Sequence, residues 1–491
     1  MTSPHPLKVP ELLFQVATYV PARSLPTCAR VCKTWHRTFI MFIWEDVKAN
    51  QVGRLHSMRA LWKYRRLVKN LELDNRSPEF YELIFYPNLE SLMVSGGVGN
   101  VDPGAMVVAH HRFLTRLNLK NFRSSTLFPL WDKLLEFPGL KELAISDTTL
   151  SKKEVDKLWQ LCQRLTCVSM DEVHIPGEGM LGSMTFPNMR KIRVRHTVRV
   201  RSGLILEWLQ RCPGLEQVHC ELDREFEAGF IPLLAAKTWP GLHSLSLRSS
   251  TLRGTETRQI VEGMERIERL DLHGMSDQSA FFFMDQLRMH FGPGQRHHYH
   301  HLRELCVRSS RGIGSSVIQE ILSSCPLLEK LWGYRIQAFD IVQGQPWVCM
   351  NLQELSVSFR FDSKTIAEEQ PLVLGQVARL TKLRVLVVND GQAKFQEAFD
   401  LRVESGLGQL NKLRSLRTLG FEGSEQRMGW EEMGWMMEHW WALQTVYGTL
   451  NGRDVHGQNK EMEKRLRRHG ILAVGSKGYN HACNMPSASE N

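Results

Sequence analysis

The fold of this chain can be inferred from residues 137–145, FPGLKELAI. Its last six residues, LKELAI, place aliphatic side chains at the first, fourth and sixth positions, and a Phe-Pro pair stands just before them. The alternation of apolar and polar residues predicts a short strand whose aliphatic side chains share one buried face. The proline predicts the end of a preceding helix, because a residue before proline is driven out of the helical conformation. The stretch therefore predicts one unit of helix, turn and strand.

The same pattern recurs along most of the chain. Fourteen further copies, with aliphatic substitutions, begin at residues 68 (VKNLEL), 89 (LESLMV), 114 (LTRLNL), 165 (LTCVSM), 189 (MRKIRV), 215 (LEQVHC), 242 (LHSLSL), 267 (IERLDL), 302 (LRELCV), 328 (LEKLWG), 352 (LQELSV), 383 (LRVLVV), 416 (LRTLGF) and 443 (LQTVYG). Ten of the fourteen intervals are 24–27 residues long, a period typical of leucine-rich repeats. The repeats predict a curved, right-handed α/β solenoid with parallel strands on the concave side and helices on the convex side.

The repeats should fill residues 48–450, with about 15 units. We expect residues 451–491 to form a cap helix over NKEMEKRLRRHG and then a flexible tail. Three intervals are longer than the others and contain GPGQRHHYHH, FDSKTIAEEQPLVL and DGQAKFQEAFDLRVESGLG. These three segments are expected to protrude as loops.

Composition limits the class of protein. The 491 residues are 42% hydrophobic and 23% charged, which excludes disorder, collagen and coiled coil for the chain as a whole. The net charge of +10 favours acidic partners but is too dilute to indicate nucleic acid. Ten cysteines without a C-x-x-C pair fit the reducing cytoplasm or nucleus. Neither a signal peptide nor a membrane span is expected.

Residues 6–47 do not fit the repeat and predict a separate helical module. VPELLFQVATYV predicts a helix that begins at Pro10, and Ser24 is the expected N-cap of a second helix. In order, Val9-Pro10, Leu12-Leu13, Val16, Tyr19-Val20, Pro21, Leu25, Val31-Cys32-Lys33, Trp35 and Ile43-Trp44 match the F-box motif. The segment therefore resembles an F-box, although its Pro-Glu-Leu opening is one residue shorter than the commonest form.

An F-box followed by such repeats resembles the F-box/leucine-rich-repeat family, and this resemblance implies a function. Members are non-catalytic substrate receptors of SCF ubiquitin ligases, in which the F-box docks on a Skp-class adaptor held by cullin and the repeats hold a protein substrate. The implied adaptor-binding residues are Pro10, Leu12, Leu13, Val16, Tyr19, Leu25, Val31, Trp35 and Trp44, with Leu13, Val16 and Leu25 as anchors. Without the resemblance, the same apolar residues would be interpreted as helical core.

Substrate should bind at the polar strand positions, whose side chains alternate with the buried leucines and face solvent. The candidates are Lys191, Arg193, Arg195, Arg248, Arg308, Lys330, Trp332 and Tyr334, and Arg190, Arg199 and Arg201 extend the first three into a basic cluster. Arginine side chains suit carboxylate and phosphate, so an acidic or phosphorylated substrate is expected. The alternative for the same residues is a solvated charged face.

Three rival interpretations stay open. The chain could be a protein-binding scaffold without a ligase role, or a nucleic-acid binder through Arg190–Arg201, although that cluster lacks interleaved aromatic residues. A metal-dependent enzyme would use the histidine-rich run Arg296–His301, which lacks the spacing of known metal sites. Gly177, Gly179 and Gly182 have the spacing of the G-x-G-x-x-G motif of dinucleotide-binding proteins. They do not lie in the strand–helix–strand unit that this motif requires. We therefore expect no catalytic residue, metal, cofactor or membrane partner.

Overall fold

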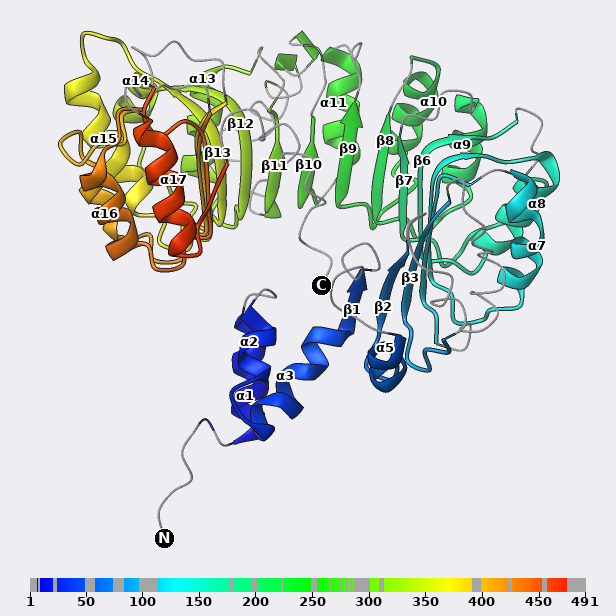
Figure 1. Cartoon of the computed structure of the whole chain (residues 1–491). Coiled ribbons are helices and arrows are strands. Elements are labelled where there is room, and N and C mark those ends of the chain that lie inside the picture. The colour runs from blue at the N-terminus through cyan, green and yellow to red at the C-terminus, as the bar shows by residue number, and fades with distance from the viewer. Residues whose placement is uncertain are drawn as a thin grey trace. The chain divides into compact units, whose positions relative to one another are not determined.

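The structure is a computed structural model in which two compact units, Met1–Glu216 and Gln217–Asn491, can be distinguished. It describes residues 7, 9–20, 24–48, 58–73, 84–96, 113–122, 124–176, 181–195, 201–221, 224–248, 254–264, 266–272, 276, 278–279, 281–282, 285, 301–308, 313–390, 399–422, 426–452 and 457–474. Figure 1 labels the helices and strands of both units.

The first unit begins with a small helical domain of three helices, α1 (Pro10–Tyr19), α2 (Leu25–Ala29) and α3 (Lys33–Glu45). Proline suits the start of α1 because the first helical N–H has no partner within the helix. The domain has its own core, formed by buried Leu13, Ala17, Leu25, Ala29 and Phe39 with partly buried Val20, Cys28, Trp35, Phe42 and Ile43 around them.

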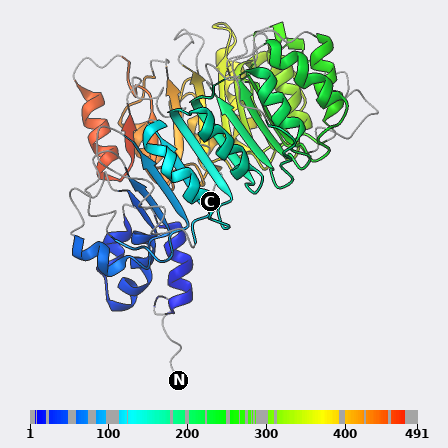
Figure 2. The same ribbon diagram turned by 90° about the vertical axis from the view of Figure 1, so that its right-hand side faces the viewer.

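The helical domain continues into the repeats without a linker. Helix α3 ends at Glu45, and strand β1 (Asp46–Lys48) follows at once and pairs in parallel with β2 (Asn70–Leu73). Trp44 is buried with its ring 5.0 Å from the ring of Tyr64, the last residue of α5 (Met58–Tyr64). Figure 2 shows the blue helices leading into this end of the sheet. The orientation of α3 is therefore set by the first repeat.

The described part of the first unit contains seven strands, each paired in parallel with the next: β1, β2, β3 (Ser91–Ser95), β4 (Arg116–Lys120), β5 (Glu142–Thr149), β6 (Cys167–His174) and β7 (Lys191–Arg195). The leucines at the fourth position of the pattern stand in register from strand to strand, for example Leu71, Leu92, Leu117 and Leu143. Helices α7 (Ser124–Leu135), α8 (Lys152–Cys162) and α9 (Ser202–Gln210) lie along one face of these strands (Figure 1).

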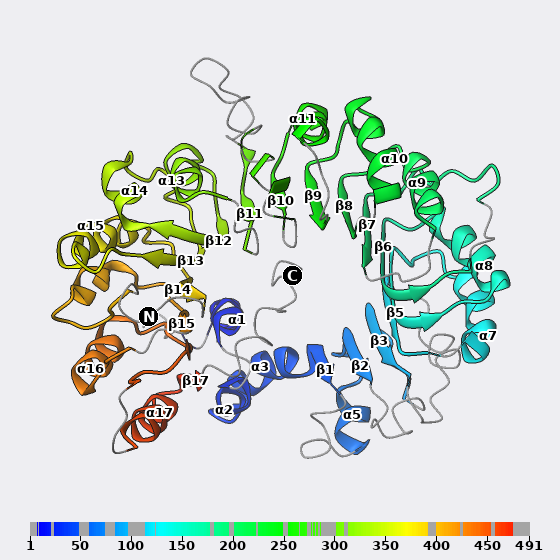
Figure 3. The ribbon, with the colours of Figure 1, turned by 90° about the horizontal axis from the view of Figure 1, so that it is seen from above.

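The second unit repeats this plan. Its described strands also pair in parallel with their neighbours, and they are β8 (Gln217–Glu221), β9 (Ser244–Arg248), β10 (Arg269–Asp271), β11 (Glu304–Cys306), β12 (Lys330–Gln337), β13 (Glu354–Arg360), β14 (Val385–Asp390), β15 (Thr418–Glu422), β16 (Thr445–Tyr447) and β17 (Leu472–Val474). Its helices are α10 (Arg224–Ala235), α11 (Gly254–Gly263), α13 (Ser315–Ser324), α14 (Ala338–Gln343), α15 (Ile366–Ala378), the 3-10 helix η6 (Leu407–Lys412), α16 (Trp430–His439) and α17 (Gln458–Arg468). Figure 3 shows the labelled helices along one face of this sheet.

The predicted architecture is confirmed: the first unit contains the short helices followed by parallel α/β repeats, and the second unit contains further parallel α/β repeats. All fifteen copies of the pattern contain a strand, β2 to β16. Strands also occur beyond both predicted ends of the repeats, because β1 pairs with β2 in the first unit and β17 pairs with β16 in the second. The segment expected to form a cap helix contains α17, and β17 follows it. The expected flexible tail, residues 475–491, lies outside the described residues.

One of the three longer intervals forms a helix instead of the expected loop. FDSKTIAEEQPLVL contributes most of helix α15, in which Pro371 lies inside the helix. A proline there removes one helical hydrogen bond, but Val373, Leu374 and Val377 are fully buried and hold the helix in place. Of the other two segments, residues 292–300 and 391–398 lie outside the described residues.

The described helices include none that is both long and apolar enough to cross a bilayer.

Most cysteines of the described chain are buried, and this leads to a test of the packing. Burial raises the pKa of the Cys212 and Cys349 thiols to about 12, so at pH 8 roughly one thiol in ten thousand is ionised there. Cys32 is exposed. Alkylation of the native chain with iodoacetamide at pH 8, followed by peptide mass spectrometry, should label Cys32 and leave Cys212 and Cys349 unlabelled until denaturant is added. Equal labelling of all three in the native chain would contradict the packing.

Candidate functional site

Helix α1 carries two apolar stripes, of which one is exposed. Leu13 and Ala17 lie in the core of the helical domain. Leu12, Val16 and Tyr19 recur at four- and three-residue steps, so they share another side of the helix; they are 42%, 38% and 83% exposed. We call Leu12, Val16 and Tyr19 the apolar stripe.

Exposed apolar side chains concentrate in this domain. Among the described residues, eighteen large hydrophobic side chains are exposed, and seven of them precede residue 42: Leu7, Leu12, Phe14, Val16, Tyr19, Val31 and Met41. A concentration of exposed apolar area marks a surface that another molecule covers. The domain is also too small to bury all its apolar residues in one core. The helices therefore offer a partner-binding surface.

The structure separates the predicted adaptor-binding residues into two groups. Pro10, Leu12, Val16, Tyr19 and Val31 are exposed, and Trp35 is half-buried with its Nε1 3.3 Å from the carbonyl oxygen of Leu7. Leu13, Leu25 and Trp44 are 0%, 7% and 3% exposed. These three side chains therefore expose little or no surface to an adaptor in this conformation. Leu13 and Leu25 stabilise the helical domain, and Trp44 stabilises its junction with the repeats.

The basic cluster of the first unit lies along β7. Lys191, Arg193 and Arg195 are half-buried and alternate with buried Ile192 and Val194, as strand geometry predicts. We call the side of each sheet that faces away from its repeat helices the far face, and these three residues belong to it.

Part of the cluster is already used within the unit. Arg190 donates from Nη1 to the carbonyl oxygen of Gly214 at 2.8 Å, and its Nε lies 3.7 Å from Oε1 of Glu216. Arg201 is the exposed N-cap residue of α9, and Arg199 lies outside the described residues. The predicted run of six basic side chains is therefore not wholly available, which weakens its use as a continuous anion-binding strip.

In the second unit, the prediction for Tyr334 on β12 is wrong. Tyr334 was expected to face solvent, but it is only 5% exposed. The pairing of β12 with β13 shifts register between Trp332 and Arg335, so alternation breaks and Tyr334 turns inward. Arg335 is half-buried on the far face instead, with its guanidinium 4.6 Å from the centre of the Tyr334 ring.

The other predicted residues of β12, Lys330 and Trp332, lie on the far face as predicted. Trp332 and Lys330 are half-buried, and Nζ of Lys330 lies 3.3 Å from Oε1 of Glu304 and 3.8 Å from Oε1 of Glu354. Burial raises the pKa of the Glu354 carboxyl, although the charge of Lys330 opposes this. The side chain of Arg248 on β9 lies outside the described residues.

Arg308, two residues after β11, donates from Nη2 to Oγ of Ser356 at 2.8 Å. Ser356 belongs to β13, and β12 lies between β11 and β13. The Arg308 side chain therefore spans β12 on the far face.

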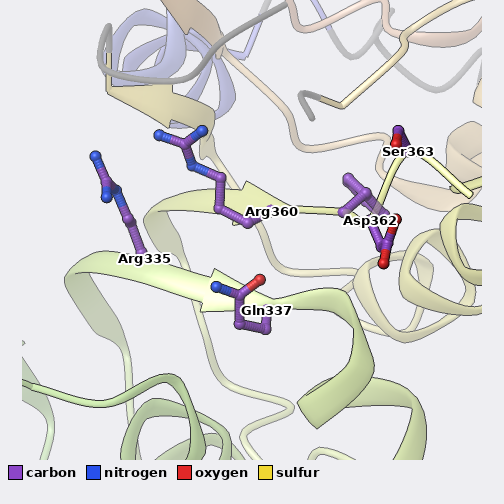
Figure 4. A pocket seen from close by; sticks show the side chains of 6 residues that line it. Arg335, Gln337, Arg360, Asp362 and Ser363 are labelled. Carbon is purple, nitrogen blue, oxygen red and sulfur yellow. The ribbon is translucent and has the colours of Figure 1, made fainter. Parts of the chain in front are cut away.

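A pocket of about 380 Å³ lies at the ends of β12 and β13. Its lining residues are Arg335, Gln337, Arg360, Phe361, Asp362 and Ser363. Figure 4 shows Arg335 and Arg360 on neighbouring strands, with Asp362 and Ser363 on the segment that follows β13. The sequence pattern does not predict this pocket, because a strict alternation along β12 directs Arg335 into the core.

Within the described ranges, no group of three or more histidine, cysteine, aspartate or glutamate residues is placed to hold a metal ion. Of the histidine-rich run, residues 296–300 lie outside those ranges, and so do Gly177 and Gly179 of the glycine-rich segment.

Comparison with known proteins identifies the helical domain. A family model described as F-box-like matches residues 10–47. No curated protein matches the chain.

Two solved structures are similar at low identity. The crystal structure of the TLR13–ssRNA13 complex is 12% identical, with a TM-score of 0.31 over 84% of this chain and 54% of that one. The chain thus spans about half the length of that relative. The crystal structure of the Rad7 and Elc1 complex in yeast is 14% identical, with a TM-score of 0.45 over 98% of this chain and 100% of that one.

Proposed function

We propose that this chain, whose residues 10–47 form an F-box-like domain, is a non-catalytic substrate receptor of an SCF-type ubiquitin ligase. In this proposal the helical domain binds a Skp-class adaptor held by cullin, and the repeats bind a protein substrate, in the cytoplasm or nucleus. The observation that carries the proposal is the apolar stripe, which remains exposed although Leu13 and Ala17 of the same helix are buried in the core of the domain.

The junction between the domain and the repeats supports a positioning role. Helix α3 runs directly into β1, and the backbone N–H of Lys69 donates to the carbonyl oxygen of Glu45 at 3.0 Å. Lys69 Nζ also lies 2.8 Å from Oε1 of Glu45, and this contact raises the pKa of Lys69. An adaptor bound to the helices would therefore be held in a fixed orientation to the first repeats.

The repeats supply a surface suited to binding a protein. Each strand adds polar side chains to the far face while its leucines build the core, so the surface can vary without cost to the fold. Arg193, Trp332 and Arg335 are examples of half-buried side chains in such positions. Arginine and tryptophan are enriched among the residues that dominate binding energy at interfaces.

The test is co-purification of the full chain with a Skp-class adaptor and cullin. The double variant Leu12→Asp/Val16→Asp should reduce adaptor binding by about 100-fold or more, since each change places a charge in an apolar contact, where a hot-spot residue contributes roughly 2 kcal/mol. The chain should stay folded, because both side chains are exposed.

Phe113→Asp is the matched control. Phe113 is 54% exposed and lies outside the helical domain, so its replacement places an aspartate at an exposed apolar position without touching the apolar stripe. Undiminished adaptor binding by the double variant would rule out the stripe as the docking site. No binding by the unaltered chain would rule out the ligase role itself.

A further inference from the structure

Two arginines meet at the far face of the second unit because of the irregularity in β12. After the register shift, Arg335 pairs with Ser358 and Gln337 pairs with Arg360 on β13. Residues two apart on a strand share a face, so Arg335, Gln337 and Arg360 project from the same side. Figure 4 shows their side chains beside one another.

The pocket that they line is rich in hydrogen-bond donors. Two guanidinium groups, the amide of Gln337 and the hydroxyl of Ser363 all line its 380 Å³. Arg360 is 8% exposed. Arg335 is half-buried, and its Nε is buried without a hydrogen-bond partner among the described residues. A buried donor of this kind is costly unless an acceptor meets it.

One carboxylate also lines the pocket. Oδ1 of Asp362 accepts a hydrogen bond from the backbone N–H of Lys364 at 2.9 Å, in the turn that precedes α15. Asp362 is therefore engaged by its own loop, and it is the one carboxylate among the six residues that line the pocket.

We propose that this pocket binds a phosphorylated side chain of a protein partner. The identification of this partner as a substrate rests on the proposed function. Two guanidinium groups match a group with two negative charges and several acceptor oxygens. The pocket volume of about 380 Å³ is at the small end of ligand sites, which suits one side chain. The half-buried Trp332 on the same strand offers a contact for residues that flank it.

Binding is tested with the full chain and fluorescent degenerate peptides that carry a central phosphoserine, phosphothreonine or phosphotyrosine. Fluorescence anisotropy should detect binding of the phosphorylated peptides, and Arg335→Gln should weaken it by about tenfold or more, since a charge-assisted hydrogen bond is lost. Asp362→Asn should tighten it about 2–5-fold, because it removes the opposing charge and keeps an acceptor for Lys364. A variant that merely unfolds the chain cannot tighten binding.

Arg414→Gln is the control for net charge. Arg414 is exposed in the same unit and does not line the pocket, so this variant should bind as the unaltered chain does. Equal losses in Arg335→Gln and Arg414→Gln would overturn the proposal, and so would equal binding of unphosphorylated or glutamate-containing peptides. Retention on phosphoinositide vesicles without phosphopeptide binding would also overturn it.

Phosphopeptide binding by the pocket and the proposed ligase role can be tested separately. Peptide binding is measured without adaptor, and Leu12→Asp/Val16→Asp should leave it unchanged. Phosphopeptide binding by a chain that binds no adaptor would support the pocket and contradict the ligase role. Adaptor binding without phosphopeptide binding would support the ligase role and contradict the pocket.

Discussion

Leu13→Asp should unfold the helical domain, whereas Leu12→Asp at the neighbouring position should leave it folded. Leu13 is fully buried with Leu25 and Phe39, and Leu12 is 42% exposed. An aspartate at position 13 would lose the apolar contacts and bury an unpaired charge, at a cost of about 5 kcal/mol. The free energy of unfolding of a domain of about 40 residues is small, so a loss of this size should unfold it.

Hydrogen exchange with mass spectrometry on the full chain would measure this difference. Leu13→Asp should abolish protection of the amides in α1 to α3, while Leu12→Asp should retain it. Adaptor binding should be lost in Leu13→Asp because the domain unfolds, and it should weaken by about tenfold or more in Leu12→Asp because a charge enters the apolar stripe. Retained protection in Leu13→Asp would mean that the core of the domain is wrongly assigned.

Trp44→Ala should loosen the junction between the helical domain and the first repeats. Trp44 is 3% exposed and packs against Tyr64, and removing a buried tryptophan side chain costs about 3–5 kcal/mol. Trp44 does not belong to the core cluster of α1 to α3. The variant should therefore keep its adaptor-binding surface while α5, β1 and β2 lose stability.

The readout is again hydrogen exchange, now in residues 46–48 and 58–73. Exchange there should accelerate in Trp44→Ala, and adaptor co-purification should persist. Trp62→Ala is the matched control, because Trp62 lies on the same helix α5 as Tyr64 but is 52% exposed. Unchanged exchange in Trp44→Ala would contradict the assignment of Trp44 to the junction.

The apolar residues of α1 show why contact residues could not be identified from sequence. Leu12, Leu13, Val16 and Ala17 are all apolar or small, so periodicity places two stripes on the helix without saying which one is packed. Only the packing of α2 and α3 decides this, and it buries Leu13 and Ala17. The predicted anchors Leu13 and Leu25 lie in the core for this reason, and Val16 does not.

The direction of side chains along a strand could be predicted where the alternation of buried and exposed residues is unbroken. Lys191, Arg193 and Arg195 face away from the core as expected, because side-chain direction alternates along a regular strand. Alternation carries no information about a register shift, so the inward direction of Tyr334 and the outward direction of Arg335 could not be predicted. The pocket at Arg335 and Arg360 depends on that shift.

The repeat could be predicted from the amino-acid sequence. Its period, the in-register leucines and the F-box-like segment are local or periodic features, and each strand is placed by its own residues and by the need to bury one face. Which polar side chains have neighbours from other repeats depends on the tertiary structure. Arg190 is engaged by Gly214, whereas Arg335 is brought beside Arg360. Such contacts join neighbouring repeats rather than neighbouring residues, so no local pattern encodes them.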